Sequence, residues 1–234
     1  MTAILKREMN SYFKSPIGYV YLAIYFVFTG LFFSLTTFGS LSSDMSTTFT
    51  WMFIISMLLI PLLTMKLMGD DRRQKTDQVL LTAPVNVTSI VLGKFFAAFL
   101  TFCISVGISL FYAVLLSMFS TPAWSIIVGN IIGLLFVGLA MVAIGQFVSS
   151  LTESPVVSII ITYAISIFLI LMDMLIGLFN NDFMYKLIGF ISFNIRYSSF
   201  TGATLDLSCF VYFISLSAIF LFLTVRMLES RRWS

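Results

Sequence analysis

Residues 124–148 read WSIIVGNIIGLLFVGLAMVAIGQFV, a run of 25 residues without one charged side chain. A helix needs about 20 mostly apolar residues to cross the ~30 Å hydrocarbon core of a bilayer. This run therefore predicts a transmembrane helix. Further runs that meet the same criterion are 17–38, 49–68, 93–118, 156–179 and 206–227. The sequence predicts an all-α membrane protein, with six transmembrane helices in one domain over residues 1–234.

The composition agrees with this fold class. Of the 234 residues, 59% are hydrophobic and 10% are charged, and the mean hydropathy is +1.05. A soluble domain carries about 25% charged residues, so the lipid bilayer is the expected surrounding. The formal net charge of +3 is too small for the basic surface of a nucleic-acid-binding protein, and no nucleic-acid partner is expected.

The basic residues predict the orientation, because cytoplasmic loops of membrane proteins carry an excess of Lys and Arg. With a cytoplasmic N-terminus, six spans return the C-terminus to the cytoplasm. Eleven of the 13 basic residues then lie on the cytoplasmic side: Lys6, Arg7, Lys14, Lys66, Arg72, Arg73, Lys75, Lys94, Arg226, Arg231 and Arg232. Lys186 and Arg196 lie outside. The sequence therefore predicts that both termini are cytoplasmic.

Residues 2–15 (TAILKREMNSYFKS) have the pattern of an amphipathic helix. Its apolar face holds Ile4, Leu5, Met9, Tyr12 and Phe13. The opposite face holds Lys6, Arg7, Asn10, Ser11 and Lys14, and Glu8 is the exception to the pattern. We expect an interfacial helix on the inner leaflet; the alternative is a simple basic anchor.

The segment 69–94 reads GDDRRQKTDQVLLTAPVNVTSIVLGK and contains the densest charge in the chain. We expect a cytoplasmic loop in which a short amphipathic helix spans Thr76 to Thr82. Pro84 ends that helix, and Asn86 can cap the next one. Such a loop is either a docking site for a cytoplasmic partner or a solvated connection, and composition alone favours neither.

The segment 180–206 is predicted to be an extracellular connector. Its aromatic and aliphatic side chains are spaced for short helices at the outer interface: Phe183, Tyr185, Leu187, Ile188, Phe190, Ile191 and Phe193. These could line an exit gate, but an aromatic belt is the favoured interpretation.

Two features stand out inside the apolar spans. Asp173 is the one carboxylate well within a span, and an acid there is a candidate for a transport or gating role; structural pairing or simple protonation are the alternatives. Glycines recur in the fourth span at positions 129, 133, 138 and 145. Such small residues let helices approach closely, and packing within the subunit is favoured over a dimer seam.

Several stretches resemble the permease subunits of ABC-2-type ABC transporters, most closely their gliding-motility-type branch. TDQVLLTAPVNVTSIVLGK is similar to the family's cytoplasmic loop, roughly GT-x-E-x-LL-x-x-P followed by GK. KREMNSYFKSPIGY resembles its N-terminal entry, SSLTES resembles its break between spans four and five, and RYSSFTGATLDLSCFVYF with LFLTVRMLESRRW resembles its last stretch and final span. Lys75 stands where the family often has Gly, and Gln78 where it often has Glu.

The resemblance implies an exporter subunit whose loop after the second span is the coupling helix that enters a groove of the ATPase subunit. The residues that it assigns to ATPase coupling are Asp71, Arg72, Thr76, Gln78, Leu80, Leu81 and Pro84. It also implies a multi-pass protein of the bacterial inner (plasma) membrane. The implied partners are an ABC ATPase subunit, a second permease copy or paralogue, and an envelope accessory protein.

The chain itself is not expected to be an enzyme. Gly93-Lys94 is the only GK dipeptide and Phe95 follows it, so the phosphate-binding sequence G-x-x-x-x-G-K-[ST] is missing. ATP and Mg²⁺ are therefore expected in the partner ATPase. No catalytic, cofactor-binding or metal-binding residue is assigned, since the sequence has no His and its Cys103 and Cys209 lack metal-ligand spacing.

Two functions remain open at this point. The first is the transmembrane subunit of an ATP-driven exporter, in which a separate ATPase drives substrate translocation. The alternative is a non-transporting membrane subunit of an ABC-type mechanical complex that acts on envelope partners. An intramembrane enzyme is disfavoured because the spans hold a single Asp, no His and no Ser–Lys pair at matching depth.

Overall fold

The computed structural model describes residues 2–39, 43–73, 86–176, 189, 191–202 and 206–232, and within these ranges it is helical without a β-strand. The elements in chain order are α1 (Thr2–Lys14), α2 (Pro16–Phe33), the π-helix η1 (Ser34–Phe38), α3 (Ser46–Thr64), α4 (Lys66–Arg73), α6 (Val87–Ser117), α7 (Trp124–Leu151), α8 (Pro155–Ile176), α10 (Phe193–Thr201) and α11 (Leu207–Arg232). Six helices are long and apolar enough to cross a membrane: 16–38, 46–69, 87–117, 124–151, 155–172 and 207–230. The predicted all-α membrane fold is confirmed.

Apolar content predicts that the third span starts at residue 93, but α6 begins at Val87. Asn86 occupies the predicted N-cap position, but its side chain makes no capping hydrogen bond. The added turns are held by packing, because Val87 and Val91 form a small apolar cluster with Met68 and with partly buried residues of α11. The 31 residues of α6 give a length of about 46 Å at 1.5 Å per residue. This helix therefore extends beyond the hydrocarbon core.

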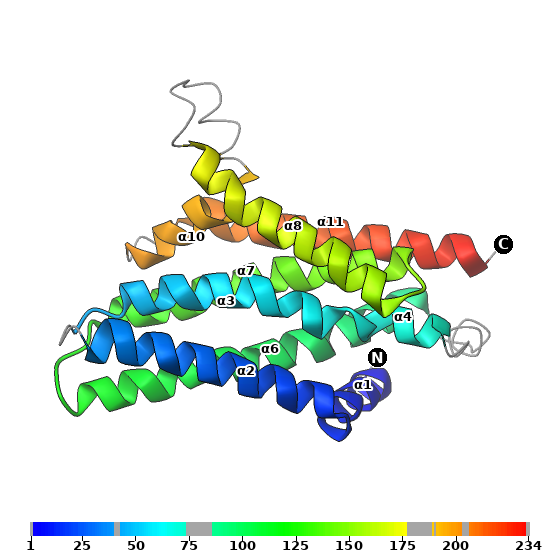
Figure 1. Cartoon of the computed structure of the whole chain (residues 1–234). Coiled ribbons are helices and arrows are strands. Elements are labelled where there is room, and N and C mark those ends of the chain that lie inside the picture. Colours follow the sequence, from blue (N-terminus) through cyan, green and yellow to red (C-terminus); the bar gives the residue numbers. More distant parts are fainter. Residues whose placement is uncertain are drawn as a thin grey trace.

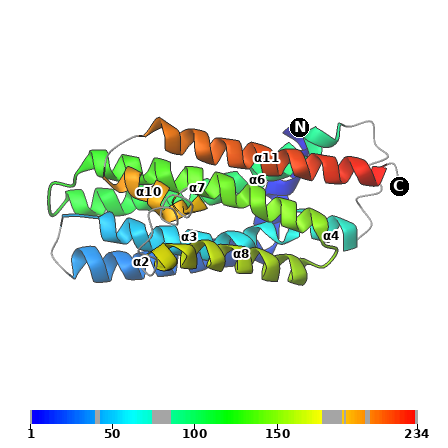
Figure 2. The same cartoon turned by 90° about the horizontal axis from the view of Figure 1, so that it is seen from above.

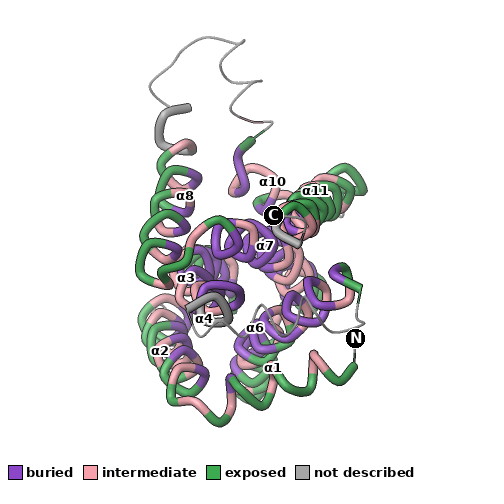
Figure 3. Tube along the Cα trace, turned by 90° about the vertical axis from the view of Figure 1, so that its right-hand side faces the viewer, coloured by how far each residue is buried: buried purple, intermediate pink, exposed green. Residues whose placement is uncertain are grey.

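Helix α7 is the centre of the bundle. It contacts α3, α4, α6, α8, α10 and α11, and Figures 2 and 3 show it enclosed by these neighbours. Its four glycines each face another element of the same chain: Gly129 and Gly133 face Phe200 of α10, Gly138 faces Phe102 of α6, and Gly145 faces Thr64 of α3. Packing within the subunit, the favoured reading of these glycines, is confirmed.

Hydroxyl groups join α2 to the helices on either side of it. Three pairs make this contact: Tyr21–Ser105 (3.3 Å), Tyr25–Ser56 (3.3 Å) and Thr29–Tyr112 (3.2 Å). The first and third pairs reach α6, and the second reaches α3. Polar side chains inside a bilayer need partners of this kind because lipid offers no hydrogen bonds.

One end of the bundle collects the segments that carry most of the basic residues. We call it the basic end; it consists of α1, α4, the first turns of α6 and the last turns of α11 (Figure 1, right). Both chain termini lie there, as an even number of spans requires. Helix α1 runs crosswise to the bundle outside α6 (Figures 1 and 3).

Helix α10 lies at the opposite end and corrects one prediction. Phe193 was assigned to an aromatic belt, but it is 2% exposed and packs edge-on against Phe213 of α11. Tyr197 and Phe200 of α10 are also buried. The aromatic spacing is the same for an interfacial helix and for a buried short helix. In the structure, Gly129 and Gly133 of α7 leave the space that Phe200 of α10 fills, so α10 is buried.

Candidate functional site

The residues predicted to couple to an ATPase fall partly within the described structure. The backbone of Asp71 and Arg72 belongs to α4, which follows α3 after a one-residue break at Met65. The other predicted coupling residues lie outside the described residues, with the expected short helix from Thr76 to Thr82: Thr76, Gln78, Leu80, Leu81 and Pro84. The structure therefore describes the first residues of the predicted loop and the contacts that attach α4 to the bundle.

Asp173, the predicted transport or gating residue, lies in the last turn of α8. At 1.5 Å per residue it is about 27 Å along the helix from Pro155. Because Pro155 follows the break at the basic end, Asp173 lies toward the opposite end of the bundle, as the sequence predicts.

The first turn of α4 is capped by a side chain of another helix. The first four N–H groups of a helix have no partner within it. Ser149 of α7 is fully buried, and its Oγ accepts hydrogen bonds from the N–H of Met68 (3.1 Å) and of Gly69 (3.2 Å). The same hydroxyl donates to the carbonyl of Met65 at the break (3.2 Å). Ser149 therefore fixes both the break and the start of α4 to α7.

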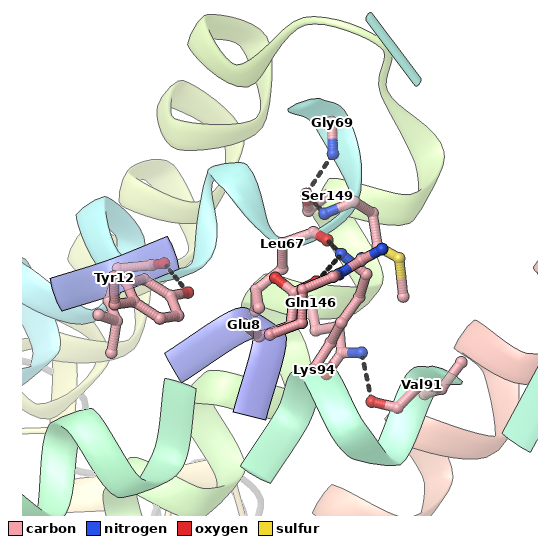
Figure 4. A network of polar contacts seen from close by, with 11 residues as sticks. Glu8, Tyr12, Leu67, Gly69, Val91, Lys94, Gln146 and Ser149 are labelled. Atoms are coloured by element: carbon pink, nitrogen blue, oxygen red, sulfur yellow. Dashed lines mark hydrogen bonds and ion pairs between the residues drawn. The ribbon is translucent and has the colours of Figure 1, made fainter. Parts of the chain in front are cut away.

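Lys94 of α6 also contacts the first turn of α4. Its side chain is 2% exposed, and its ammonium group donates a hydrogen bond to the carbonyl of Leu67 in α4 at 2.6 Å. It also lies 3.3 Å from Oε1 of Glu8 on α1. Figure 4 shows these groups converging between α1, α4 and α6. A buried ammonium group needs such partners, because an unpaired charge there is costly.

Glu8 is the one acidic residue among the positions where α1 meets the bundle. It was the exception to the amphipathic pattern of residues 2–15, and its side chain is only 13% exposed. The carboxylate Oε1 forms the ion pair with Lys94 and accepts a hydrogen bond from Arg7, whose guanidinium lies 2.6 Å away. Tyr12 adds a second anchor, since its hydroxyl donates to the carbonyl of Leu63 at 2.8 Å. The apolar face of α1 thus rests on protein and carries a specific ionic contact.

Gln146 of α7 contacts α6 close to the start of α4. It is fully buried, and its Nε2 donates to the carbonyl of Val91 in α6 at 2.9 Å. Its Oε1 has no hydrogen-bond partner within the described part of the chain. One turn of α7 therefore contacts α3 through Gly145, α6 through Gln146 and α4 through Ser149.

We call Glu8, Lys94, Gln146 and Ser149, with the α3–α4 break that Ser149 contacts, the junction. It contains no group of three or more metal-ligating side chains, and the described residues hold none elsewhere. Its groups are matched by charge and hydrogen bonding across helices. The arrangement can hold α4 in a fixed relation to α1, α3, α6 and α7, and can transmit a displacement of α4 to them.

A separate polar cluster lies at the opposite end. Asn130 of α7 accepts hydrogen bonds at Oδ1 from the hydroxyls of Tyr197 (2.9 Å) and Thr201 (3.0 Å) of α10. Burial raises the pKa of Tyr197 well above its ordinary value, so this hydroxyl remains a donor at physiological pH. The cluster fastens α10 to the glycine-rich part of α7.

Sequence reasoning assigned no functional role to Lys94, Glu8, Gln146 or Ser149. Two of these residues, Lys94 and Glu8, were unusual in the sequence. Lys94 is a charged residue at the start of an apolar span and belongs to the GK of the family-like sequence. Glu8 is an acidic residue on the otherwise apolar face of residues 2–15. No protein-family model and no curated protein matches the chain.

Proposed function

We propose that this chain is the transmembrane subunit of an ATP-driven ABC-2-type exporter in the bacterial inner membrane, and that a separate ATPase subunit hydrolyses the ATP. The observation that carries the proposal is the attachment of α4. This helix ends at Arg73, two residues before the sequence TDQVLLTAP, which resembles the family's coupling loop. It is held by α6 through Lys94 and by α7 through Ser149.

The junction gives the coupling a physical route. If an ATPase grips the loop that follows α4, a displacement of the loop acts on hydrogen bonds of 2.6–3.2 Å to α6 and α7. Helix α7 contacts most of the bundle, so the ends of several spans move together. Packed interfaces of this kind move between discrete arrangements rather than bending continuously.

The charge distribution supports placing the ATPase at the basic end. Cytoplasmic loops carry the excess of Lys and Arg, and α1, α4 and the end of α11 carry most of these residues at one end. The proposal places α4 in the cytoplasm and α10 outside. A second copy of the chain, or a paralogue, would complete the translocation path.

The experiment is purification of the tagged full chain from its native membrane in mild detergent, with mass spectrometry of what accompanies it. We expect a nucleotide-binding chain and ATP hydrolysis in the complex. Leu80→Glu with Leu81→Glu should release that chain while the membrane protein remains monodisperse. Ser154→Glu is the matched control, because it adds charge at an exposed position in the break before α8 and should retain the ATPase.

Three results would contradict the proposal in whole or in part. Absence of a nucleotide-binding chain in the native complex would remove its basis. An ATPase-containing complex that moves no substrate in vesicles, but remains bound to a large envelope protein, would favour the mechanical alternative. Retention of the ATPase by the double Leu variant would show that the loop after α4 is not the contact.

A further inference from the structure

We propose that the outward face of α1 binds the headgroups of anionic phospholipids, and that Arg7 transmits this binding through Glu8 and Lys94 to α4. This lipid-binding surface and its effect on α4 are separate from the proposed exporter function. Both are measured on the chain alone, so that this proposal can fail while the exporter proposal stands.

The first step is the direction of the basic face. An amphipathic helix at a membrane surface ordinarily turns its apolar face to lipid. Here that face is used on the protein, because Met9 and Phe13 pack against the core and Tyr12 bonds to Leu63. Helix α1 lies crosswise outside α6, with its exposed side turned away from the bundle axis (Figure 3). The polar face of α1 therefore points away from the bundle, toward the expected headgroups of the cytoplasmic leaflet.

The second step is the charge on that face. Lys6, Arg7 and Lys14 are exposed, together with the neutral Asn10 and Ser11. The one carboxylate of the helix, Glu8, is turned inward toward Lys94. A face with three cations and no exposed acid, at the end of the bundle expected to meet the negatively charged cytoplasmic leaflet, is complementary to anionic headgroups. The occupant to which we assign it is therefore anionic phospholipid in the bilayer.

The third step is the link from this face to the junction. Oε1 of Glu8 is shared by Arg7 at 2.6 Å and Lys94 at 3.3 Å. Two cations that share one oxygen repel each other, and each weakens the hold of the other on the carboxylate. Arg7 is half-exposed, and a guanidinium binds phosphate oxygens in a favourable forked geometry. A lipid phosphate that draws Arg7 away leaves the carboxylate to Lys94, which tightens α1 against α6 and against Leu67 of α4.

The test uses hydrogen exchange of the full-length chain in nanodiscs of phosphatidylcholine, with or without phosphatidylglycerol. Phosphatidylglycerol should slow amide exchange in α1 and in the first turn of α4 by roughly fivefold, the factor that corresponds to about 1 kcal/mol. Lys6→Gln with Lys14→Gln should lower the amount of phosphatidylglycerol retained after detergent extraction, as measured by native mass spectrometry. Arg226→Gln removes an exposed cation from α11 at the same end and should change neither quantity.

Two variants separate lipid binding from its transmission. Arg7→Gln removes the second cation from Glu8, so that the carboxylate pairs with Lys94 alone. The amides of α4 should therefore exchange slowly in both lipid mixtures. Glu8→Gln removes the link, so phosphatidylglycerol should still protect α1 but no longer α4. A wild-type response in Arg7→Gln would overturn the role of Arg7. Equal exchange of the wild type in both lipids, or the same protection from soluble glycerol phosphate, would overturn the lipid site.

Discussion

Lys94 on α6 and Glu8 on α1 form an ion pair of 3.3 Å in which the lysine is 2% exposed and the glutamate 13%. Ion pairs on protein surfaces contribute little, because water screens both charges and the side chains lose freedom. A pair withdrawn from water behaves differently, since removal of one partner strands the other. This pair fixes the crosswise helix to the place where α4 begins.

Lys94→Met should destabilise the protein by about 2–3 kcal/mol, less than the loss of a fully buried pair because Glu8 keeps Arg7. The change also removes the donor to the Leu67 carbonyl. The measurement is the free energy of unfolding in mixed micelles. In a double-mutant cycle with Glu8→Gln we expect a coupling of about 1–2 kcal/mol.

Arg226→Gln is the matched control for that prediction. Arg226 and Glu229 also lie 3.3 Å apart, but their side chains are 66% and 40% exposed. Loss of this pair should change the free energy of unfolding by at most about 0.5 kcal/mol. Equal losses in the two variants would show that burial of Lys94 confers no special importance on its pair.

Gly145→Ala should force α7 away from α3. A Cβ at position 145 would lie 2.7 Å from Cβ of Thr64 and closer still to its Oγ1, and Thr64 is fully buried. Overpacking of this kind costs about 1–3 kcal/mol. Gly107→Ala in α6 is the control, because a Cβ there meets nothing within 4 Å. That variant should be neutral or about 0.5–1 kcal/mol more stable, and a similar loss in both would refute the packing argument.

The spans were predictable because length and apolar content are local properties of a sequence. The amphipathic pattern of α1 was predictable for the same reason, since Ile4, Leu5, Met9, Tyr12 and Phe13 share one side of a helix and are all at least partly buried. The prediction placed this face on the inner leaflet, whereas in the structure it packs against the protein. The start of α6 at Val87 does not follow from apolar content, but the predicted N-cap at Asn86 places it correctly. Thr88 and Ser89 lower the apolar content of residues 87–92, and it is contact with α4 and α11 that keeps them helical.

The junction could not be derived from the sequence, because its partners come from α1, α4, α6 and α7. Glu8 was visible as an irregularity and Lys94 as a costly charge, but nothing in the sequence paired them. Ser149 looked like part of a polar break before the fifth span. The structure shows instead that its hydroxyl faces α4, a relation set by the close approach of α7 to α3 at Gly145.

Asn130→Ala should loosen α10. The substitution removes the acceptor of the Tyr197 and Thr201 hydroxyls and leaves Tyr197 with the Phe49 carbonyl at 3.4 Å. An unsatisfied buried donor costs about 1–3 kcal/mol. Limited proteolysis should detect faster cleavage near residues 193–201. Tyr197→Phe is the milder comparison, because Asn130 keeps Thr201, and its cost should be about 0.5–1.5 kcal/mol; a reversed order of the two variants would contradict the role of Asn130.

Ser149→Ala tests whether α4 depends on a cap from α7. Without the hydroxyl, the N–H groups of Met68 and Gly69 lose their acceptor while they remain buried. A local loss of about 1–3 kcal/mol corresponds to roughly 5- to 150-fold faster opening. Hydrogen exchange at these two amides is the direct measurement, and exchange in the middle of α7 should not change.

Ser150→Ala is the control for this prediction, since it removes an equally buried hydroxyl one residue away. Ser150 donates to the Phe147 carbonyl of its own helix at 2.6 Å, so its loss should leave the Met68 and Gly69 amides unchanged. If the proposed ATPase complex is obtained, Ser149→Ala should retain the ATPase subunit but reduce ATP-dependent transport, because α4 remains attached to the loop but is no longer fixed to α7. Transport at the wild-type level with an uncapped α4 would mean that motion reaches the bundle by a route that does not pass through Ser149.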